Sequence, residues 1–171
     1  MGFFRGDSAF GFQSFDLDPD FICLAKGISG GVFPLGAVFV KEKITRFYDN
    51  HILACGLTNY AHPLGLAVSN EVLNILCEES FQKKLNRLKK EFQKQIMGLK
   101  KIPNVQTVRV MGLIACIELK NSNKDFSYYF ERGLHLFIKE NKIILAPPYI
   151  LGIKKLQEAM KQLGTLLKGD E

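Results

Sequence analysis

The sequence lacks the cysteine spacing that is typical of metal-binding and disulfide-stapled proteins. Its four cysteines stand far apart and form no C-x-x-C pair: Cys23, Cys55, Cys77 and Cys116. Zinc sites and disulfide frameworks need closely spaced or paired cysteines, so we expect neither a metal site nor structural disulfides. Unpaired thiols are typical of a reducing compartment, which predicts a cytoplasmic protein.

Long apolar runs and targeting segments are also lacking. Every hydrophobic stretch is interrupted, or is shorter than the roughly 20 residues that a membrane-spanning helix requires. No segment has the pattern of a secretory signal peptide. At 171 residues with 47% hydrophobic residues, the chain can bury a sizeable core, which predicts one globular domain or two small ones and no membrane partner.

Positive charge is in excess, with a formal net charge of +6, and it is concentrated in one segment. Residues 82–101 hold eight Lys and Arg residues against the single acidic residue Glu91. Apolar residues recur there at steps of three and four, which predicts an amphipathic helix with its cations in water. A basic face can also bind an anionic partner, but none of the motifs or aromatic platforms of nucleic-acid-binding proteins accompanies it. We therefore expect a solvated face and no nucleic-acid partner.

The most informative segment is the run from Pro19 to Val40, in which one lysine stands between two apolar strands. Lys26 falls where the first strand ends, and three glycines follow it within five residues. Such glycines allow tight turns and close approach of another group. A lysine at a strand end inside this fold is expected to be partly desolvated, which would lower the pKa of its amine and free it as a nucleophile for a carbonyl. The local pattern alone also fits a solvated lysine followed by an ordinary loop.

The wider string resembles the cofactor-lysine segment of the class III pyridoxal-phosphate-dependent aminotransferases, which include ornithine, acetylornithine and diaminopelargonate aminotransferases. The resemblance rests on motifs in the family's order: Pro19-Asp20, the strand from Phe21, Ala25-Lys26-Gly27, Gly30-Gly31 and Pro34-Leu35-Gly36-Ala37. Three further segments resemble the family in the same order, so that the likeness covers nearly the whole chain: Gly2 to Ser8, Gly56 to Ala67 and Leu145 to Leu151.

This resemblance implies an α/β fold of fold type I, as in other transferases that depend on pyridoxal phosphate. Residues 1–79 would be the C-terminal part of the large cofactor-binding domain, and residues 80–171 the small C-terminal α+β domain. It implies pyridoxal 5'-phosphate as the cofactor and Lys26 as the Schiff-base lysine, which both binds the cofactor and acts in catalysis. It also implies a homodimer with a shared site, in which Thr58 donates its hydroxyl to the cofactor phosphate of the neighbouring subunit. From the local pattern alone, Thr58 fits equally well as the cap of a turn.

The resemblance further implies that other parts of the cofactor site would precede Met1. These are the carboxylate that keeps the cofactor ring nitrogen protonated, the phosphate loop and the ring-stacking aromatic residue. We therefore expect this chain to be the C-terminal part of an aminotransferase, with little activity by itself. The complete enzyme would transfer an amino group between an amine or amino acid and an oxo acid or aldehyde. The alternative is a catalytically dead fragment that only binds a partner chain. The sequence does not indicate the amino donor or acceptor.

Periodicity and turn residues predict the elements along the chain. Pro63 is expected at the first position of a helix, Ser80 as the cap of the basic helix, and Gly133 at a helix end. His62 is expected to be a structural residue, and Arg109 fits either a functional or a structural role. We expect strands at 21–25, 36–41, 105–109, 113–119, 134–138 and 142–145, and helices at 42–50, 63–78, 81–99, 125–132 and 153–167.

Overall fold

The computed structural model describes residues 2–121 and 124–169, and the chain divides into two compact units. The first unit holds the described part of residues 1–4 together with residues 8–82. The second unit holds residues 5–7 and the described residues from 83 onward. The division falls close to the boundary at 79/80 that the sequence suggests. The assignment of the units to the large and small domains of an aminotransferase stays a prediction.

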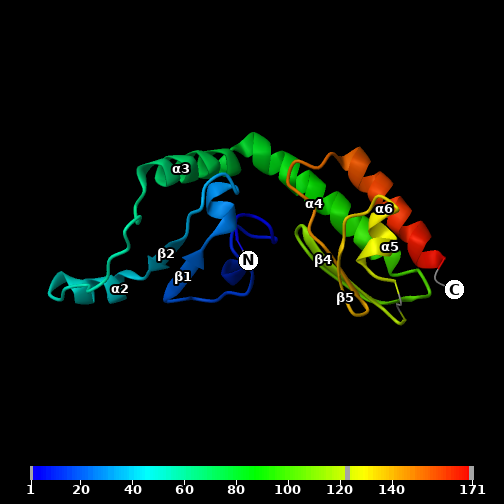
Figure 1. Cartoon of the computed structure of the whole chain (residues 1–171), viewed down its shortest axis with the longest axis horizontal. Helices are drawn as coiled ribbons and strands as arrows, with labels where there is room; N and C mark the ends of the chain where they lie inside the picture. Colours follow the sequence, from blue (N-terminus) through cyan, green and yellow to red (C-terminus); the bar gives the residue numbers. More distant parts are fainter. Residues whose placement is uncertain (1, 122–123, 170–171) are drawn as a thin grey trace. The chain divides into compact units, whose positions relative to one another are not determined.

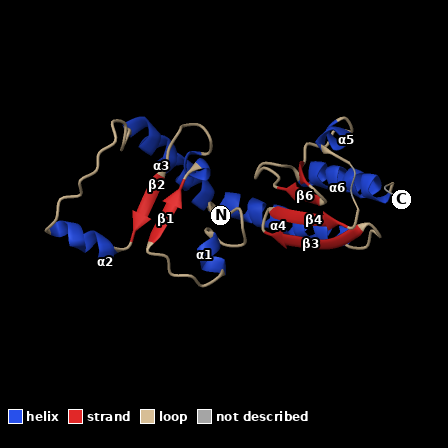
Figure 2. Ribbon diagram, turned by 60° about the horizontal axis from the view of Figure 1, so that its bottom comes forward, coloured by secondary structure: helices blue, strands red, loops and turns tan. Residues whose placement is uncertain are grey.

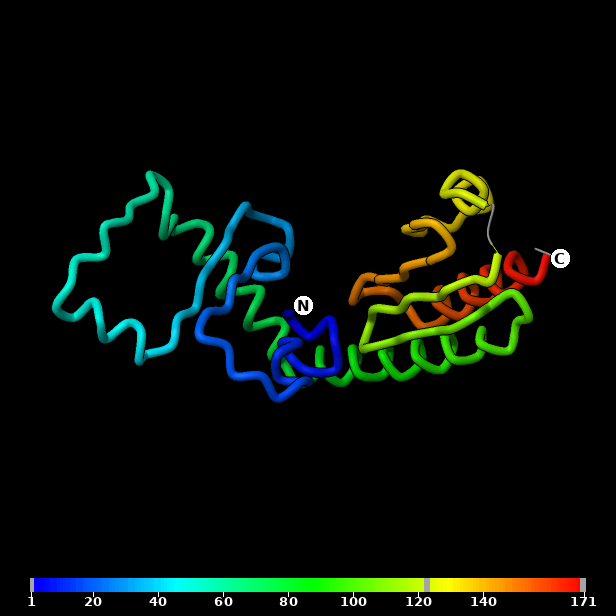
Figure 3. Tube along the Cα trace, turned by 90° about the horizontal axis from the view of Figure 1, so that it is seen from below, coloured from blue at the N-terminus to red at the C-terminus, as the bar shows by residue number. Residues whose placement is uncertain are grey.

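The first unit is built around one antiparallel strand pair and one long helix (Figure 1). Strand β1 (Phe21–Leu24) pairs with β2 (Ala37–Val40) in the register Phe21↔Val40 to Leu24↔Ala37. The other elements are α1 (Gly11–Ser14), the 3-10 helix η1 (Lys26–Ser29), α2 (Glu42–Thr45), the 3-10 helix η2 (Arg46–Asp49) and α3 (Pro63–Cys77). A connection without helix or strand joins η2 to α3 (Figure 3), and residues 51–61 of it are all exposed. Both predicted strands of this unit are confirmed.

Helix α3 begins as its sequence predicts, with Pro63 at the first helical position. There proline costs nothing, because the first amide of a helix has no intrahelical acceptor. The helix ends at Cys77, because the next residue, Glu78, has an extended ψ of 133°. Helix α4 (Glu79–Leu99) begins at the next residue. The prediction that Ser80 caps α4 is therefore wrong, since Ser80 lies inside its first turn and donates to the Glu78 carboxylate.

The second unit is a four-stranded antiparallel sheet in the order β3–β4–β6–β5 (Figure 2). Its other elements are helices α4 and α5 (Phe126–Phe130) and the last helix, α6 (Ile153–Lys168). The strands are β3 (Val105–Met111), β4 (Ile114–Leu119), β5 (Phe137–Lys139) and β6 (Lys142–Leu145). Along β4, buried and half-buried residues alternate, as expected for a sheet that packs one face on a core. Helices α4 and α6 lie side by side, and a side chain at Gly164 of α6 would be 3.4 Å from Leu99 of α4.

Burial is very uneven between the two units. Of the described apolar side chains, three are buried in the first unit: Phe3, Ile28 and Leu76. Twenty are buried in the second unit, among them a stripe on α4 formed by Leu85, Leu88, Phe92 and Ile96. Burial of apolar surface is the dominant stabilising contribution to folding, so the second unit holds most of the hydrophobic core.

Candidate functional site

Lys26 stands at the end of β1, where the strand turns directly into the 3-10 helix η1. Its own backbone is left-handed, with φ of 55°, and Gly30 and Gly31 follow with φ of 60° and 83°. Glycine adopts this region freely, but a lysine in it carries conformational strain. Strained residues of this kind are concentrated at functional sites, so the backbone singles out Lys26 independently of any sequence motif.

The Lys26 side chain is exposed. The expectation that the fold desolvates this amine is therefore wrong for the described chain. The reason lies in the sheet, because among the described residues β1 pairs only with β2, and the residues of β1 are half-buried or exposed. The described part of the first unit therefore leaves the Lys26 side chain in contact with water.

The turn that carries Lys26 is held by contacts from within the first unit. Ile28 and Ser29 are buried, and the Ser29 hydroxyl donates to the carbonyl oxygen of Phe33. A side chain at Gly30 would lie 3.3 Å from Val72 of α3. These contacts fix the peptide groups on the C-terminal side of Lys26, while its side chain stays accessible.

Thr58 lies in the exposed connection before α3 and lines an open pocket of about 710 Å³. The pocket joins this connection to the end of β1 at Leu24 and to the start of β2 at Ala37. Lys26 is not among the described residues that line it, so the structure does not bring the two predicted site residues into one pocket. The role of Thr58 toward a phosphate stays a prediction.

Local partners are also seen for His62, which is predicted to be structural, and for Arg109, for which the sequence allows a functional or a structural role. The ring of His62, which precedes α3, lies 5.2 Å from the ring of Phe33. The guanidinium of Arg109 on β3 pairs with Glu118 on β4 at 3.5 Å. Both contacts are structural, and neither residue lines the pocket that contains Thr58.

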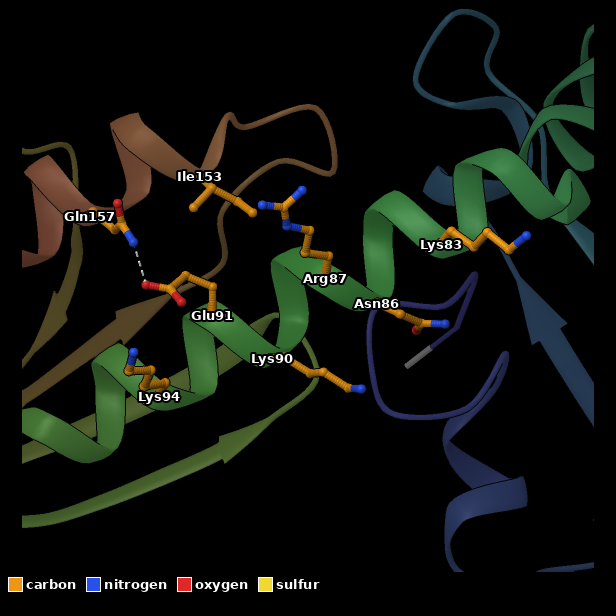
Figure 4. A pocket seen from close by; sticks show the side chains of 8 residues that line it. All are labelled: Lys83, Asn86, Arg87, Lys90, Glu91, Lys94, Ile153 and Gln157. Carbon is orange, nitrogen blue, oxygen red and sulfur yellow. Dashed lines mark hydrogen bonds between the residues drawn. The ribbon is translucent and has the colours of Figure 1, made fainter.

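A second surface feature is a groove of about 580 Å³ between α4 and α6 (Figure 4). Its charged lining is mostly basic and comes from α4: Lys83, Arg87, Lys90 and Lys94, with Glu91 among them. Gln157 of α6 donates to Glu91 at 2.7 Å, and this hydrogen bond is the main reason why the pKa of Glu91 is lowered. The lysines and Arg87 are exposed, as expected for the solvated face of an amphipathic helix.

The segment Arg5–Asp7 forms a cluster that the sequence did not indicate. The Leu113 amide donates to the Arg5 carbonyl at 2.8 Å, and the Gly112 amide donates to the Asp7 carboxylate at 2.9 Å. The Arg5 guanidinium donates to the Pro147 carbonyl and lies 4.3 Å from the centre of the Tyr149 ring. Burial raises the pKa of Tyr149, and the charge of Arg5 opposes that rise. The cluster ties a short N-terminal segment into the second unit.

No group of three or more His, Cys, Asp or Glu side chains in the described parts of the chain could hold a metal ion. Within those same residues, no helix is long and apolar enough to cross a membrane.

Comparison with solved structures identifies the fold class of the chain. A transaminase solved with L-alanine superposes with a TM-score of 0.87 at 26% identity, covering 98% of this chain and 44% of that chain. The taurine:2-oxoglutarate aminotransferase from Bifidobacterium kashiwanohense, solved with PLP and glutamate, superposes with a TM-score of 0.87 at 25% identity, over 98% and 42% of the two chains. The described chain is thus part of an α/β fold of fold type I, as the sequence predicts.

The sequence profile of the family "Aminotransferase class-III" matches residues 1–167. The chain therefore belongs to the class III aminotransferase family. It is 28% identical to gamma aminobutyrate transaminase 2 of Solanum lycopersicum and 30% identical to vanillin aminotransferase of Capsicum chinense. In both comparisons 99% of this chain aligns with 41% of the relative. The chain thus spans about two fifths of the length of these curated relatives.

Proposed function

We propose that the protein to which this chain belongs is a transaminase that depends on pyridoxal 5'-phosphate. It would transfer an amino group between an amine or amino acid and an oxo acid or aldehyde. The observation that carries the proposal is the strained, exposed lysine at the strand end, Lys26, within a chain of the class III family. Support for the cofactor comes from related proteins whose structures hold PLP or PMP.

The residues present fit this cofactor in two respects. Lys26 offers an accessible primary amine, the group that pyridoxal phosphate enzymes use to hold the cofactor carbonyl. Thr58 offers an accessible hydroxyl donor on a pocket wall, which suits a phosphate oxygen. Bound pyridoxal phosphate supplies an electron sink for the electrons released at the substrate Cα.

The protein's own part in the reaction rests on Lys26. Its Nζ would anchor the cofactor until a donor amine replaces it. The freed amine would then take a proton from the Cα of the amino donor and, in the second half of the transfer, deliver a proton to the Cα of the acceptor. Thr58 would orient the phosphate of a neighbouring subunit, which makes the protein a homodimer with a shared site. We also propose a cytoplasmic location, supported by the free state of all four cysteines.

One observation favours a second candidate function, a catalytically inactive chain that binds a partner chain. Many large apolar side chains of the first unit are exposed, including Phe21, Phe39, Ile52 and Leu57. Exposed apolar surface of this extent is typical of protein interfaces. Under this alternative Lys26 would have no chemical role.

The two candidates differ in one measurement. Pyridoxal phosphate is added to the chain, borohydride is used to reduce any covalent link, and peptide mapping finds the modified lysine. We expect the pyridoxyl group on Lys26, and its loss in the charge-preserving variant Lys26→Arg. Modification of another lysine with Lys26 intact would refute the assignment, and no modification at all would favour the partner-binding alternative.

A further inference from the structure

Three of the few buried side chains of the first unit lie in or against the turn that carries Lys26: Phe3, Ile28 and Ser29. Phe3 and Ile28 are two of its three buried apolar residues in the described chain, and both flank this turn. The Phe3 ring lies against Gly27, the residue after Lys26. A side-chain Cβ at Gly27 would stand only 2.6 Å from Phe3 Cδ2. The ring therefore packs directly on the main chain next to the lysine.

Phe3 is itself held in place at a conformational cost. Phe3 and Phe4 have consecutive left-handed φ values of 55° and 63°, a region that strains any residue with a side chain. The Phe4 amide donates to the Ala9 carbonyl at 2.9 Å, which closes this loop. The Phe10 ring packs edge-on against the Phe3 ring with centroids 5.4 Å apart. Such a costly backbone persists only where surrounding contacts fix it.

The opposite end of the turn is held by α3. Val72 lies beside Gly30, and the Phe33 ring would be 2.9 Å from a side chain at Gly65. The Ser29 hydroxyl closes the turn on the Phe33 carbonyl. Phe3 thus supplies the contact on the lysine side of the turn, and α3 supplies the contacts on the far side.

We propose that Phe3 is a positioning residue for Lys26, and this inference rests on the proposed function of Lys26. By packing on Gly27, the ring confines the peptide between Lys26 and Gly27 and limits the directions in which the amine can point. Without the ring, the turn samples more conformers. The apparent affinity of the lysine for the cofactor carbonyl then falls in proportion to the fraction that remains competent.

The test is a double-mutant cycle on the chain, with Phe3→Ala, Gly27→Ala and the double variant. Gly27 does not have a positive φ, so an alanine there is hindered by the Phe3 ring and not by its backbone. Gly98→Ala is the matched control, because a side chain at Gly98 meets no atom within 4 Å. Phe3→Leu tests whether an apolar side chain of another shape rescues the position.

Two readouts separate positioning from general stability. The first is borohydride-trapped labelling of Lys26 by pyridoxal phosphate, relative to the exposed Lys154 in the same sample. The second is amide exchange of Gly30 and Val32, whose N–H groups donate to Gly27 O at 3.2 Å and Ser29 O at 3.0 Å. Phe3→Ala is expected to lower relative labelling about tenfold, as when the competent fraction falls to about a tenth, and to speed exchange. Phe3→Leu should recover part of the labelling. Gly27→Ala should lower labelling when Phe3 is present and add nothing when Phe3 is absent.

The outcomes are distinct. Unchanged relative labelling in Phe3→Ala, or an equal effect of Gly27→Ala with and without Phe3, would overturn the positioning role. If exchange responds to Phe3→Ala while Lys26 of the unaltered chain is labelled no more than Lys154, the control of the turn by Phe3 stands. In that case the proposed function fails.

Discussion

At the scale of single residues, six described non-glycine residues have left-handed φ values: Phe3, Phe4, Asp16, Lys26, Ala61 and Glu140. Aspartate tolerates this region because its side chain can form local hydrogen bonds, whereas the other five residues pay the steric cost of their Cβ atoms. Four of the six lie in segments that resemble the family: Phe3 and Phe4 in Gly2 to Ser8, Lys26 in Pro19 to Val40, and Ala61 in Gly56 to Ala67. Strain and resemblance are separate observations, and both single out Lys26.

The strain at Lys26 can be measured without any cofactor. We expect Lys26→Gly to be more stable to urea than Lys26→Ala by about 1 kcal/mol, because glycine adopts φ of 55° without a Cβ conflict. Both variants lack the amine, so the comparison isolates the backbone. Equal unfolding midpoints would show that the turn carries no strain at this residue.

Thr58 allows a second residue-scale prediction, made for the complete enzyme. Thr58→Val should weaken pyridoxal phosphate binding by about 1–3 kcal/mol, because a phosphate oxygen would lose its donor. Thr58→Ser keeps the hydroxyl and should bind nearly as well as the unaltered enzyme. Equilibrium titration of the cofactor measures both, and unchanged affinity in Thr58→Val would leave Thr58 as a turn residue.

At the scale of elements, α4 carries one lysine, Lys89, on the apolar face that packs against the core. Lys89 is 8% exposed, and burial lowers the pKa of its amine, with the nearby Asp7 charge opposing that shift. A lysine whose pKa is lower in the folded state binds its proton more tightly when unfolded. Stability therefore rises with pH between the lowered pKa and the ordinary value near 10.5.

The sign of that linkage makes a prediction about α4. Lys89→Met should raise the unfolding temperature at pH 7, because it removes a desolvated charge while keeping an apolar stem. The gain should shrink as the pH approaches 10, where Lys89 of the unaltered chain is increasingly neutral. Lys90→Met, at an exposed position of the same helix, is the control and should show neither the gain nor its pH dependence.

Most elements could be predicted from the sequence because their signals are local. The apolar stripe of α4, Pro63 at the start of α3 and the alternation along β4 each lie within one element. The sequence predicts a start at residue 81 for the helix that begins at Glu79. The difference arises because a single extended residue, Glu78, separates α3 from α4, and one such residue does not interrupt the apolar periodicity. The packing of Phe3 on Gly27 joins distant segments, and a left-handed phenylalanine has no sequence signature. Exposure of Lys26 depends on which strands cover β1, which local pattern does not encode.

At the scale of the whole molecule, stability is expected to be as uneven as burial. Local opening costs little where few apolar side chains are buried, and the first unit has three against twenty in the second among the described residues. We expect limited proteolysis of the full chain to cut first within residues 51–61, which are all exposed and lie outside helices and strands. Mass spectrometry of the early fragments would locate the cut. A first cut within β3 to β6 would contradict this order.

The tie between Asp7 and Gly112 also sets an order of events during synthesis. These partners are 105 residues apart, and a ribosome adding about 5–20 residues per second needs roughly 5–20 s to make the second after the first. Through that interval the Arg5 carbonyl and the Asp7 carboxylate lack the two amide donors that the β3–β4 turn supplies, Leu113 and Gly112. The segment can therefore join the second unit only after the β3–β4 turn has been synthesised.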